Sequence, residues 1–213
     1  MIYPAVVAKD VDLELLLAWR GGDEGAGKQL FERWFERLYR FFCNKVGQDV
    51  DDLVQETLFQ CVRSRDTFRA ESSFRTYVFA VARHCLLRYR DKFARAGDAA
   101  EFDQSRVRAL DASPATLACE RQEQRALLRA LRRLPLELQV LLELYYWDDL
   151  TSAELAEILQ IPHGTVRSRL RRGKELVRET LATLAESGEL LHTTTDDFDR
   201  WLRSIRAARP AGT

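Results

Sequence analysis

The chain has 213 residues, enough for one larger or two small domains, and its 33 basic residues balance 33 acidic ones, so affinity for nucleic acid would need a local basic surface. No apolar run approaches the roughly 20 residues that cross a bilayer, which argues against membrane insertion. The N-terminus also lacks the basic and apolar parts of a secretory signal, so we expect a cytoplasmic protein.

Apolar residues recur at three- and four-residue spacing almost throughout, which predicts an all-α fold. The first domain is assigned to residues 1–95. Its helices are expected from Val11 to Arg20 (ending at Gly21-Gly22), from about Glu24 to Val46 (ending at Gly47), from about Asp49 and, after a polar and basic loop, from Phe74. The apolar stripe of the second helix is rich enough in aromatic rings to centre a core.

The third helix and the segment after it carry opposite charges. Asp51, Asp52, Gln55 and Glu56 lie away from the apolar face of the helix, where they either complement the helix dipole or form a protein-docking surface. Residues 63–95 are strongly basic and contain interleaved aromatic rings, a combination suited to single-stranded nucleic acid. Phe74 and Tyr77 are expected in the core, whereas Phe68 and Phe79 are the better candidates for contacts outside it.

Residues 96–118 are rich in Ala, Asp, Gly and Ser and lose apolar periodicity, which predicts a flexible linker between two domains. A second helical domain is assigned to residues 119–182. One of its helices ends at Pro135, and the next contains residues 138–146. A C-terminal extension follows at residues 183–213.

Residues 151–174 predict a helix-turn-helix. Thr151-Ser152-Ala153-Glu154 forms a capping box before a short helix, and a turn at Gln160-Ile161-Pro162 leads into a second helix without acidic residues up to Lys174. Val166, Leu170, Gly173 and Val177 form its apolar stripe. The other faces are basic and hydroxylic, which suits the major groove better than a solvated basic helix. The candidate DNA-binding residues are His163, Thr165, Arg167, Ser168, Arg171, Arg172 and Lys174.

The extension contains a further amphipathic pattern. Gly188 interrupts the preceding helix, and residues 195–197 predict a helix cap. Phe198, Trp201, Leu202 and Ile205 then lie on one helical face. An isolated helix this short is marginal in water, so its apolar face is expected to pack on one of the two domains. It either modulates DNA or polymerase binding or only extends the core of the second domain.

Two sets of motifs together resemble the extracytoplasmic-function (ECF) sigma factors of the sigma-70 family. Asp51-Asp-Leu-Val-Gln-Glu-Thr57 is similar to the region 2 helix that docks on RNA polymerase. Residues 68–77, with Ala82-Arg83, are similar to the loop and helix that open and read the −10 promoter element. Residues 134–135, 150–159 and 161–172 are similar to region 4, which reads the −35 element. The motifs occur in the same order as in the family, with a linker in the same place.

The resemblance implies a promoter-recognition subunit with no catalytic step and no cofactor or metal. Its partners would be core RNA polymerase, duplex DNA at −35, single-stranded DNA at −10 and, as a candidate, an anti-sigma factor. A base would be flipped into a pocket of the 68–73 loop. The implied −10 surface consists of Arg65, Phe68, Arg69, Ser72, Ser73, Arg75, Thr76, Tyr77, Phe79 and Arg83; the implied polymerase-binding residues are Asp51, Asp52, Gln55 and Glu56.

The sequence departs from the family pattern in the extension and at three positions. Gln160 stands where glycine is common in the turn, which predicts a strained or differently shaped backbone there. Ala80 and His84 stand where a basic residue and an asparagine are frequent, which bears on the −10 sequence preference.

Other classes of protein explain less of the chain. A conventional helix-turn-helix regulator would bind duplex DNA without polymerase, and an inhibitor of a sigma factor would make no DNA contacts. No phosphate loop or nucleophile–base pair indicates an enzyme. The four cysteines form no Cys-x-x-Cys pair, which predicts reduced thiols rather than zinc or disulfides. They are Cys43, Cys61, Cys85 and Cys119.

Overall fold

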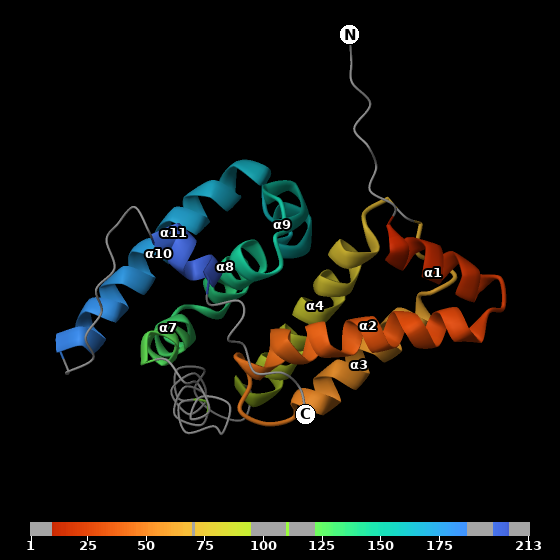
Figure 1. Ribbon diagram of the computed structural model, residues 1–213, viewed down its shortest axis with the longest axis horizontal. Helices are drawn as coiled ribbons and strands as arrows, with labels where there is room; N and C mark the ends of the chain where they lie inside the picture. The colour runs from red at the N-terminus through yellow and green to blue at the C-terminus, as the bar shows by residue number, and fades with distance from the viewer. Residues whose placement is uncertain (1–9, 70, 95–109, 111–121, 187–197, 205–213) are drawn as a thin grey trace, which may run out of the picture.

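The computed structural model of the protein describes residues 10–69, 71–94, 110, 122–186 and 198–204. Within these ranges the regular elements are all helices, which confirms the predicted all-α fold (Figure 1). The N-terminal bundle consists of α1 (Val11–Arg20), α2 (Glu24–Cys43), α3 (Val50–Arg63) and α4 (Phe74–Ala94). The C-terminal bundle consists of α7 (Gln122–Arg132), α8 (Leu136–Trp147), α9 (Ser152–Leu159), α10 (His163–Glu186) and α11 (Phe198–Ser204). No helix in the described ranges has the length and apolarity that a membrane span requires.

The core of the N-terminal bundle is centred on Trp34 of α2. Its indole is 1 % exposed and lies edge-to-face against Phe74 and Phe79 of α4, with ring centroids 6.0 and 5.4 Å away. The indole Nε1 donates a hydrogen bond of 3.1 Å to Asp12 Oδ2 in α1. Because Asp12 also accepts from Arg33 at 2.9 Å, this buried carboxylate is paired and ties α1 to α2.

The second helix ends three residues earlier than the sequence pattern predicted. The helix α2 stops at Cys43, and the amides of Lys45 and Val46 both donate to the Phe42 carbonyl, at 2.7 and 3.1 Å. This turn directs the side chains of Asn44 and Lys45 toward the C-terminal bundle, and both are buried. The helix α2 therefore ends early because Asn44 and Lys45 make contacts with the C-terminal bundle instead of continuing the helix.

The C-terminal bundle is built around the apolar α8. Trp147, at the end of α8, is 2 % exposed, and its Nε1 donates a 2.9 Å hydrogen bond to the Leu202 carbonyl in α11. Phe198 and Leu202 of α11 are buried in the same cluster as Val177 of α10. The predicted tail helix therefore docks on the second domain. The cap predicted at residues 195–197 lies outside the described residues, as do Gly188 and Ile205.

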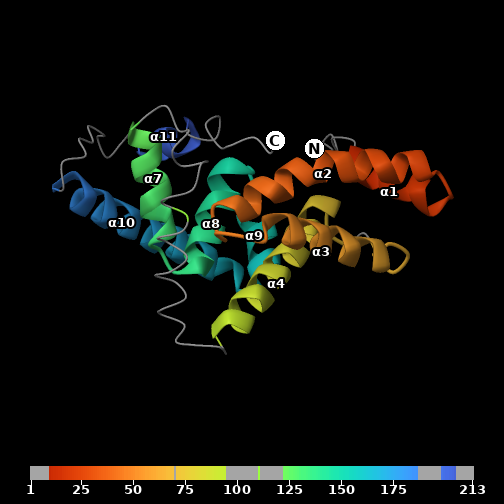
Figure 2. The ribbon, with the colours of Figure 1, turned by 90° about the horizontal axis from the view of Figure 1, so that it is seen from below.

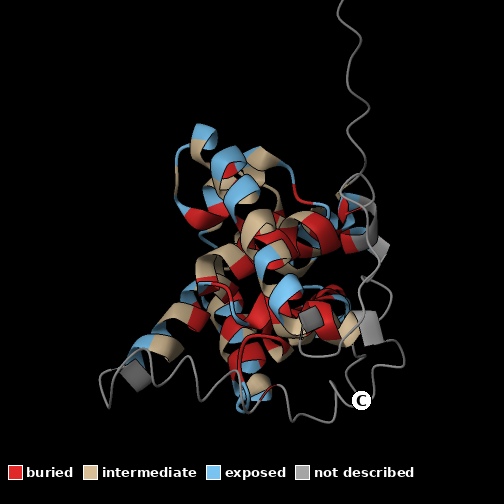
Figure 3. Cartoon of the chain, turned by 90° about the vertical axis from the view of Figure 1, so that its left-hand side faces the viewer, coloured by how far each residue is buried: buried red, intermediate tan, exposed pale blue. Residues whose placement is uncertain are grey.

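The two bundles pack directly on each other. The helix α4 lies against α9 (Figure 2). One apolar cluster runs from the N-terminal bundle into α8 and α9, where it includes Leu141 and Leu155. Buried residues are accordingly present in both bundles and where they meet (Figure 3). Of the predicted linker, 96–118, only Leu110 is described, and it is 1 % exposed.

Candidate nucleic-acid and polymerase interfaces

The turn of the helix-turn-helix forms as predicted. The Thr151 hydroxyl accepts from the Glu154 amide at 3.3 Å, and the Glu154 carboxylate accepts from the Thr151 amide at 2.8 Å, so the capping box is complete. Gln160, predicted to have a strained or differently shaped backbone, takes the left-handed conformation with φ 54°, which is strained for a residue other than glycine. The chain then turns through Pro162 into α10.

The helix α10 presents its predicted surface to solvent. Val166 and Val177 are fully buried and orient the helix. A Cβ at Gly173 would lie 3.1 Å from Leu142 Cδ1, so a larger residue here would require the Leu142 side chain of α8 to shift. The predicted DNA-binding residues lie on the other faces: His163, Arg167, Ser168, Arg171 and Arg172 are exposed, and Thr165 and Lys174 are half-buried.

Acidic residues near this surface were missed by the sequence analysis. Glu175 lies 3.6 Å from the Arg172 guanidinium, one helical turn further along α10. Asp199 of α11 lies 3.2 Å from Lys174 Nζ and accepts a 2.9 Å hydrogen bond from the Tyr146 hydroxyl. The i, i+3 spacing of Arg172 and Glu175 could have predicted their ion pair from the sequence. No helical spacing connects residues 174 and 199, so the second ion pair could not have been predicted in this way.

The loop before α4 is held by a residue that the sequence analysis did not select. Arg20, at the end of α1, donates to the carbonyls of Arg65 and Phe68 at 2.6 and 2.5 Å. The Phe68 ring packs on Phe74 and Tyr77, so it is half-buried rather than free. Among the other loop candidates, Arg69 is exposed, and Ser72 and Ser73 are half-buried.

On α4, the structure contradicts the prediction for one candidate DNA-contact residue. Phe79 was expected to face away from the core, but it is 0 % exposed and lies 5.7 Å from the Phe41 ring. The ring fills the space between α2 and α4 and cannot reach a ligand without unfolding the bundle. The expectation of an outward-facing Phe79 is therefore wrong, because both flanks of α4 are covered. Phe74 lies in the core, as predicted, and Tyr77 is half-buried.

Three polar residues of α4 that were predicted to contact the −10 element instead contact acidic residues of the C-terminal bundle. Arg75 donates to Glu154 Oε1 at 2.6 Å, and the Thr76 hydroxyl lies 3.4 Å from the same oxygen. Arg83 forms a two-pronged contact of 3.0 Å with Glu137. Burial acts to raise the pKa of Glu154, but the hydrogen bonds from Arg75 and Thr151 outweigh it and hold the pKa below its usual value.

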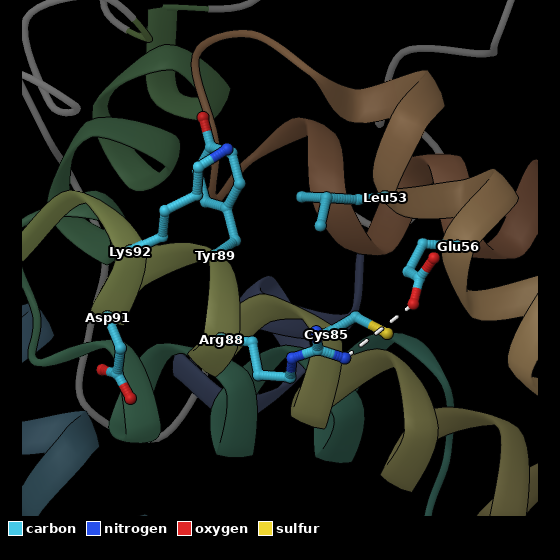
Figure 4. A pocket seen from close by; sticks show the side chains of 7 residues that line it. All are labelled: Leu53, Glu56, Cys85, Arg88, Tyr89, Asp91 and Lys92. Carbon is cyan, nitrogen blue, oxygen red and sulfur yellow. Dashed lines mark ion pairs between the residues drawn. The ribbon is translucent and has the colours of Figure 1, made fainter.

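The outer face of α3 carries the predicted polymerase-binding residues. Asp51, Asp52 and Gln55 are exposed, and Glu56 accepts from Gln60 at 2.7 Å. Glu56 also lies 3.9 Å from Arg88 across a pocket between α3 and α4, whose walls include Leu53, Cys85, Tyr89 and Lys92 (Figure 4).

The same face of α3 continues into apolar residues. Phe59, one turn after Gln55, is 55 % exposed. Val62, three residues after Phe59 on the same helix, is 38 % exposed. The i, i+4 spacing from Gln55 to Phe59 could have predicted from the sequence that both residues lie on the same face of the helix.

The described cysteines support no metal or disulfide chemistry. Cys43, Cys61 and Cys85 are free thiols, and the described residues contain no group of metal-ligating side chains. Burial, together with the neighbouring Cys85, raises the pKa of the Cys61 thiol to about 12, so this thiol keeps its proton at neutral pH. Cys119 lies outside the described residues.

Comparison with known proteins places both bundles in one family. The model described as sigma-70 region 2 matches residues 30–96, and the model described as sigma-70, region 4 matches residues 124–177. The ECF RNA polymerase sigma-E factor of Haemophilus influenzae is 28 % identical over 173 residues, covering 76 % of this chain and 91 % of that protein. The factor of the same name from Escherichia coli K12 is 27 % identical over 165 residues, covering 73 % and 86 %.

A solved structure shares the fold. The sigma factor RpoE of Bartonella quintana, in complex with the anti-sigma factor NepR, superimposes with a TM-score of 0.58 at 21 % identity, covering 73 % of this chain and 96 % of that one. The chain belongs to the sigma-70 family and is an ECF RNA polymerase sigma factor. A conventional helix-turn-helix regulator is not favoured, because it does not account for region 2 in the first bundle.

Proposed function

We propose that this sigma factor uses residues 1–95 as region 2, 96–118 as a linker and 119–182 as region 4, with 183–213 as an extension. The main support for this assignment is that each candidate binding surface lies within the residues that match the corresponding sigma-70 region. The basic face of α10 lies within region 4, and the α3 face and the 64–73 loop lie within region 2.

Region 4 would hold the duplex −35 element through α10. Exposed Arg167 and Arg171 lie on the solvent side of the helix whose opposite side, Val166 and Val177, is anchored in the core. A guanidinium can bind guanine through two hydrogen bonds in the major groove, and the neighbouring cations can neutralise phosphates. His163, Thr165 and Ser168 supply further donors at the start of the helix.

Region 2 would bind polymerase and the melted −10 strand through separate surfaces. The exposed carboxylates of α3 suit a basic partner surface, and exposed Phe59 next to them would add apolar contact area. The cations of the 64–73 loop and α4 would follow the DNA backbone, with Phe68 and Tyr77 beside an unpaired base. The factor would act in the cytoplasm with core polymerase and perform no catalytic step itself.

An anti-sigma factor is a further proposed partner, because the structural neighbour was solved with one bound. In the Bartonella quintana structure, a sigma factor of this fold is bound by an anti-sigma factor. We propose that the chain is regulated in the same general way, by a protein that competes for the surfaces used in transcription.

The test is run-off transcription with purified core polymerase on a pool of genomic promoter fragments. Discrete new transcripts that depend on the protein are expected, and alignment of the upstream DNA identifies both elements. Arg171→Ala should then reduce transcription about tenfold through the lost −35 contact. Lys28→Ala, which removes one exposed positive charge from α2, should leave it unchanged. Absence of new transcripts would contradict the proposal.

A further inference from the structure

The C-terminal end of α1 supports the loop that would read the −10 element. Arg20, the last residue of α1, is half-buried and contacts two backbone carbonyls that follow it by 45 and 48 residues. Its Nε donates to the Arg65 carbonyl at 2.6 Å, and its Nη2 donates to the Phe68 carbonyl at 2.5 Å. Because the guanidinium is planar and uses two nitrogens, it fixes the positions of both carbonyls relative to α1.

The neighbouring residue, Trp19, holds the end of α1 in place. Its ring lies edge-to-face against Phe31 of α2, with the ring centroids 5.3 Å apart. A Cβ at Gly27 would come within 2.7 Å of the same indole, so the ring lies close against the backbone of α2. The Arg65 guanidinium in turn lies 4.8 Å from the indole centroid. Trp19 therefore connects the start of the loop to α2.

The two carbonyls that Arg20 contacts belong to the turn that presents Phe68. The Phe68 amide donates to the Ser64 carbonyl at 2.9 Å, which closes this turn. The Phe68 ring lies 4.8 Å from the Tyr77 ring, and the Ser64 hydroxyl forms a hydrogen bond with the Tyr77 hydroxyl. Since Arg20 holds the backbone at Arg65 and Phe68, it determines where this pair of rings lies.

The support for the loop lies outside the part of the chain that matches the family. The sigma-70 region 2 model begins at residue 30, whereas Trp19 and Arg20 precede it. The Arg20 guanidinium is engaged with the loop backbone, so its effect on DNA would be exerted through the loop and not by direct contact. Recognition of an extruded base depends on the shape of its pocket, which must be held to about 0.5 Å.

We propose that Arg20 is a positioning residue for −10 recognition, and that it sets how strictly region 2 discriminates among the bases that the 64–73 loop reads. This inference rests on the proposed function of that loop. With both carbonyls held, the loop keeps one conformation and rejects bases that do not fit it. Without the guanidinium, the loop adopts several conformations and accepts more bases, so selectivity falls more than transcription from the preferred promoter.

The test measures base selectivity in the complete complex with core polymerase. Run-off transcription uses one promoter that the wild-type protein recognises, with each of the four bases in turn at every position of its −10 element. The transcript ratio between the best and the next-best base is determined at each position. Arg20→Gln should lower this ratio at least about threefold at the positions that the loop reads and leave the others unchanged. Lys28→Gln removes an exposed charge from α2 and should keep every ratio.

A milder variant covers the case in which Arg20→Gln does not fold. Arg20→Lys keeps the positive charge but supplies one nitrogen in place of two, so its ratio should lie between those of wild type and Arg20→Gln. Hydrogen–deuterium exchange of the full-length protein gives a second measurement that does not depend on transcription. The amides of residues 64–69 should exchange faster in both Arg20 variants than in wild type, and at the wild-type rate in Lys28→Gln.

Wild-type ratios in both Arg20 variants would overturn the proposal. A fall in transcription that is equal for all four bases would also overturn it, because that result is expected if Arg20 only stabilises the bundle. The same assay separates these failures from failure of the proposed function. Wild-type protein that supports no transcription from any promoter would contradict the sigma function itself, whereas selective transcription by wild type and by both variants would contradict the role of Arg20 alone.

Discussion

Gln160 is the residue at which backbone strain and function meet most closely. Its φ of 54° lies in the left-handed region, which costs a non-glycine residue roughly 1–2 kcal/mol, and it sits in the turn that aims α10. Its amide donates to the Glu157 carbonyl at 3.2 Å, so the conformation is held by the end of α9.

Gln160→Gly should therefore stabilise the protein. The strain disappears, while the more flexible unfolded chain offsets part of the gain, which leaves about 0.5–1 kcal/mol. Thermal unfolding followed by circular dichroism measures the difference. The matched control is Ala153→Gly in the right-handed backbone of α9, which should lower stability by up to about 1 kcal/mol. A loss of stability at Gln160→Gly would show that the side chain itself holds the turn.

Two groups with raised pKa values, one buried and one half-buried, predict a loss of stability at alkaline pH. Burial raises the pKa of Cys61 and of Tyr89 to about 12, from 9.0 and 10.0. Between pH 9 and 12 the unfolded state releases these protons while the folded state retains them, so the free energy of unfolding falls as pH rises. The slope should approach about 1.4 kcal/mol per pH unit for the buried Cys61 and should be smaller for the half-buried Tyr89, because solvent screens its environment. Urea unfolding from pH 8 to 11 measures it, and Cys61→Ala should flatten the curve relative to wild type.

At the scale of elements, α11 completes the core of region 4. Leu202 is 2 % exposed, and its carbonyl accepts from Trp147, so the helix is fixed by both apolar and polar contacts. The Arg178 guanidinium lies 4.4 Å from the Phe198 ring centroid and adds a third contact.

Leu202→Ala should lower the free energy of unfolding by about 2 kcal/mol, at the low end for a buried leucine because a terminal helix can detach locally. Chemical denaturation followed by tryptophan fluorescence reports the change, since Trp147 lies directly beneath the helix. The same substitution at Leu17, which is 53 % exposed, should change stability by less than about 0.5 kcal/mol. Equal effects at both positions would contradict docking of α11.

The same helix brings a carboxylate to the −35 surface. Because Asp199 lies 3.2 Å from Lys174 Nζ, it competes with DNA phosphate for this cation. Asp199→Asn should strengthen binding to duplex promoter DNA about twofold and steepen its salt dependence, measured by fluorescence anisotropy at several salt concentrations. Glu157→Gln removes one exposed carboxylate elsewhere in region 4 and should have a smaller effect. Unchanged affinity in Asp199→Asn would leave the extension with a purely structural role.

At the scale of the whole molecule, the two regions share a core and should unfold together. Wild-type protein should show one calorimetric transition, because the shared apolar cluster and the buried contacts of Asn44 and Lys45 with Glu143 couple the regions. Glu143→Lys should split this transition into two, since each region then unfolds without its neighbour. Glu157→Lys should keep a single transition. Two transitions already in the wild type would mean that the shared core does not couple them.

The helices, the capping box, the turn at Gln160 and the solvent side of α10 followed from the sequence alone. All of these depend on interactions between residues close in the chain, such as Thr151 with Glu154, or on helical periodicity, such as Val166 with Val177. The order of the region 2 and region 4 motifs likewise identified the family before any contact was known.

Other features required the tertiary structure, because they join residues that no sequence spacing connects. Arg20 holds the loop at Phe68, Asp199 pairs with Lys174, and Phe79 is buried although its position on α4 suggested an outward face. Above all, the pairing of Lys45 with Glu143 links positions 98 residues apart. Periodicity shows which face of a helix is apolar, but only the packing of two domains decides which charges become buried partners and which surface is covered.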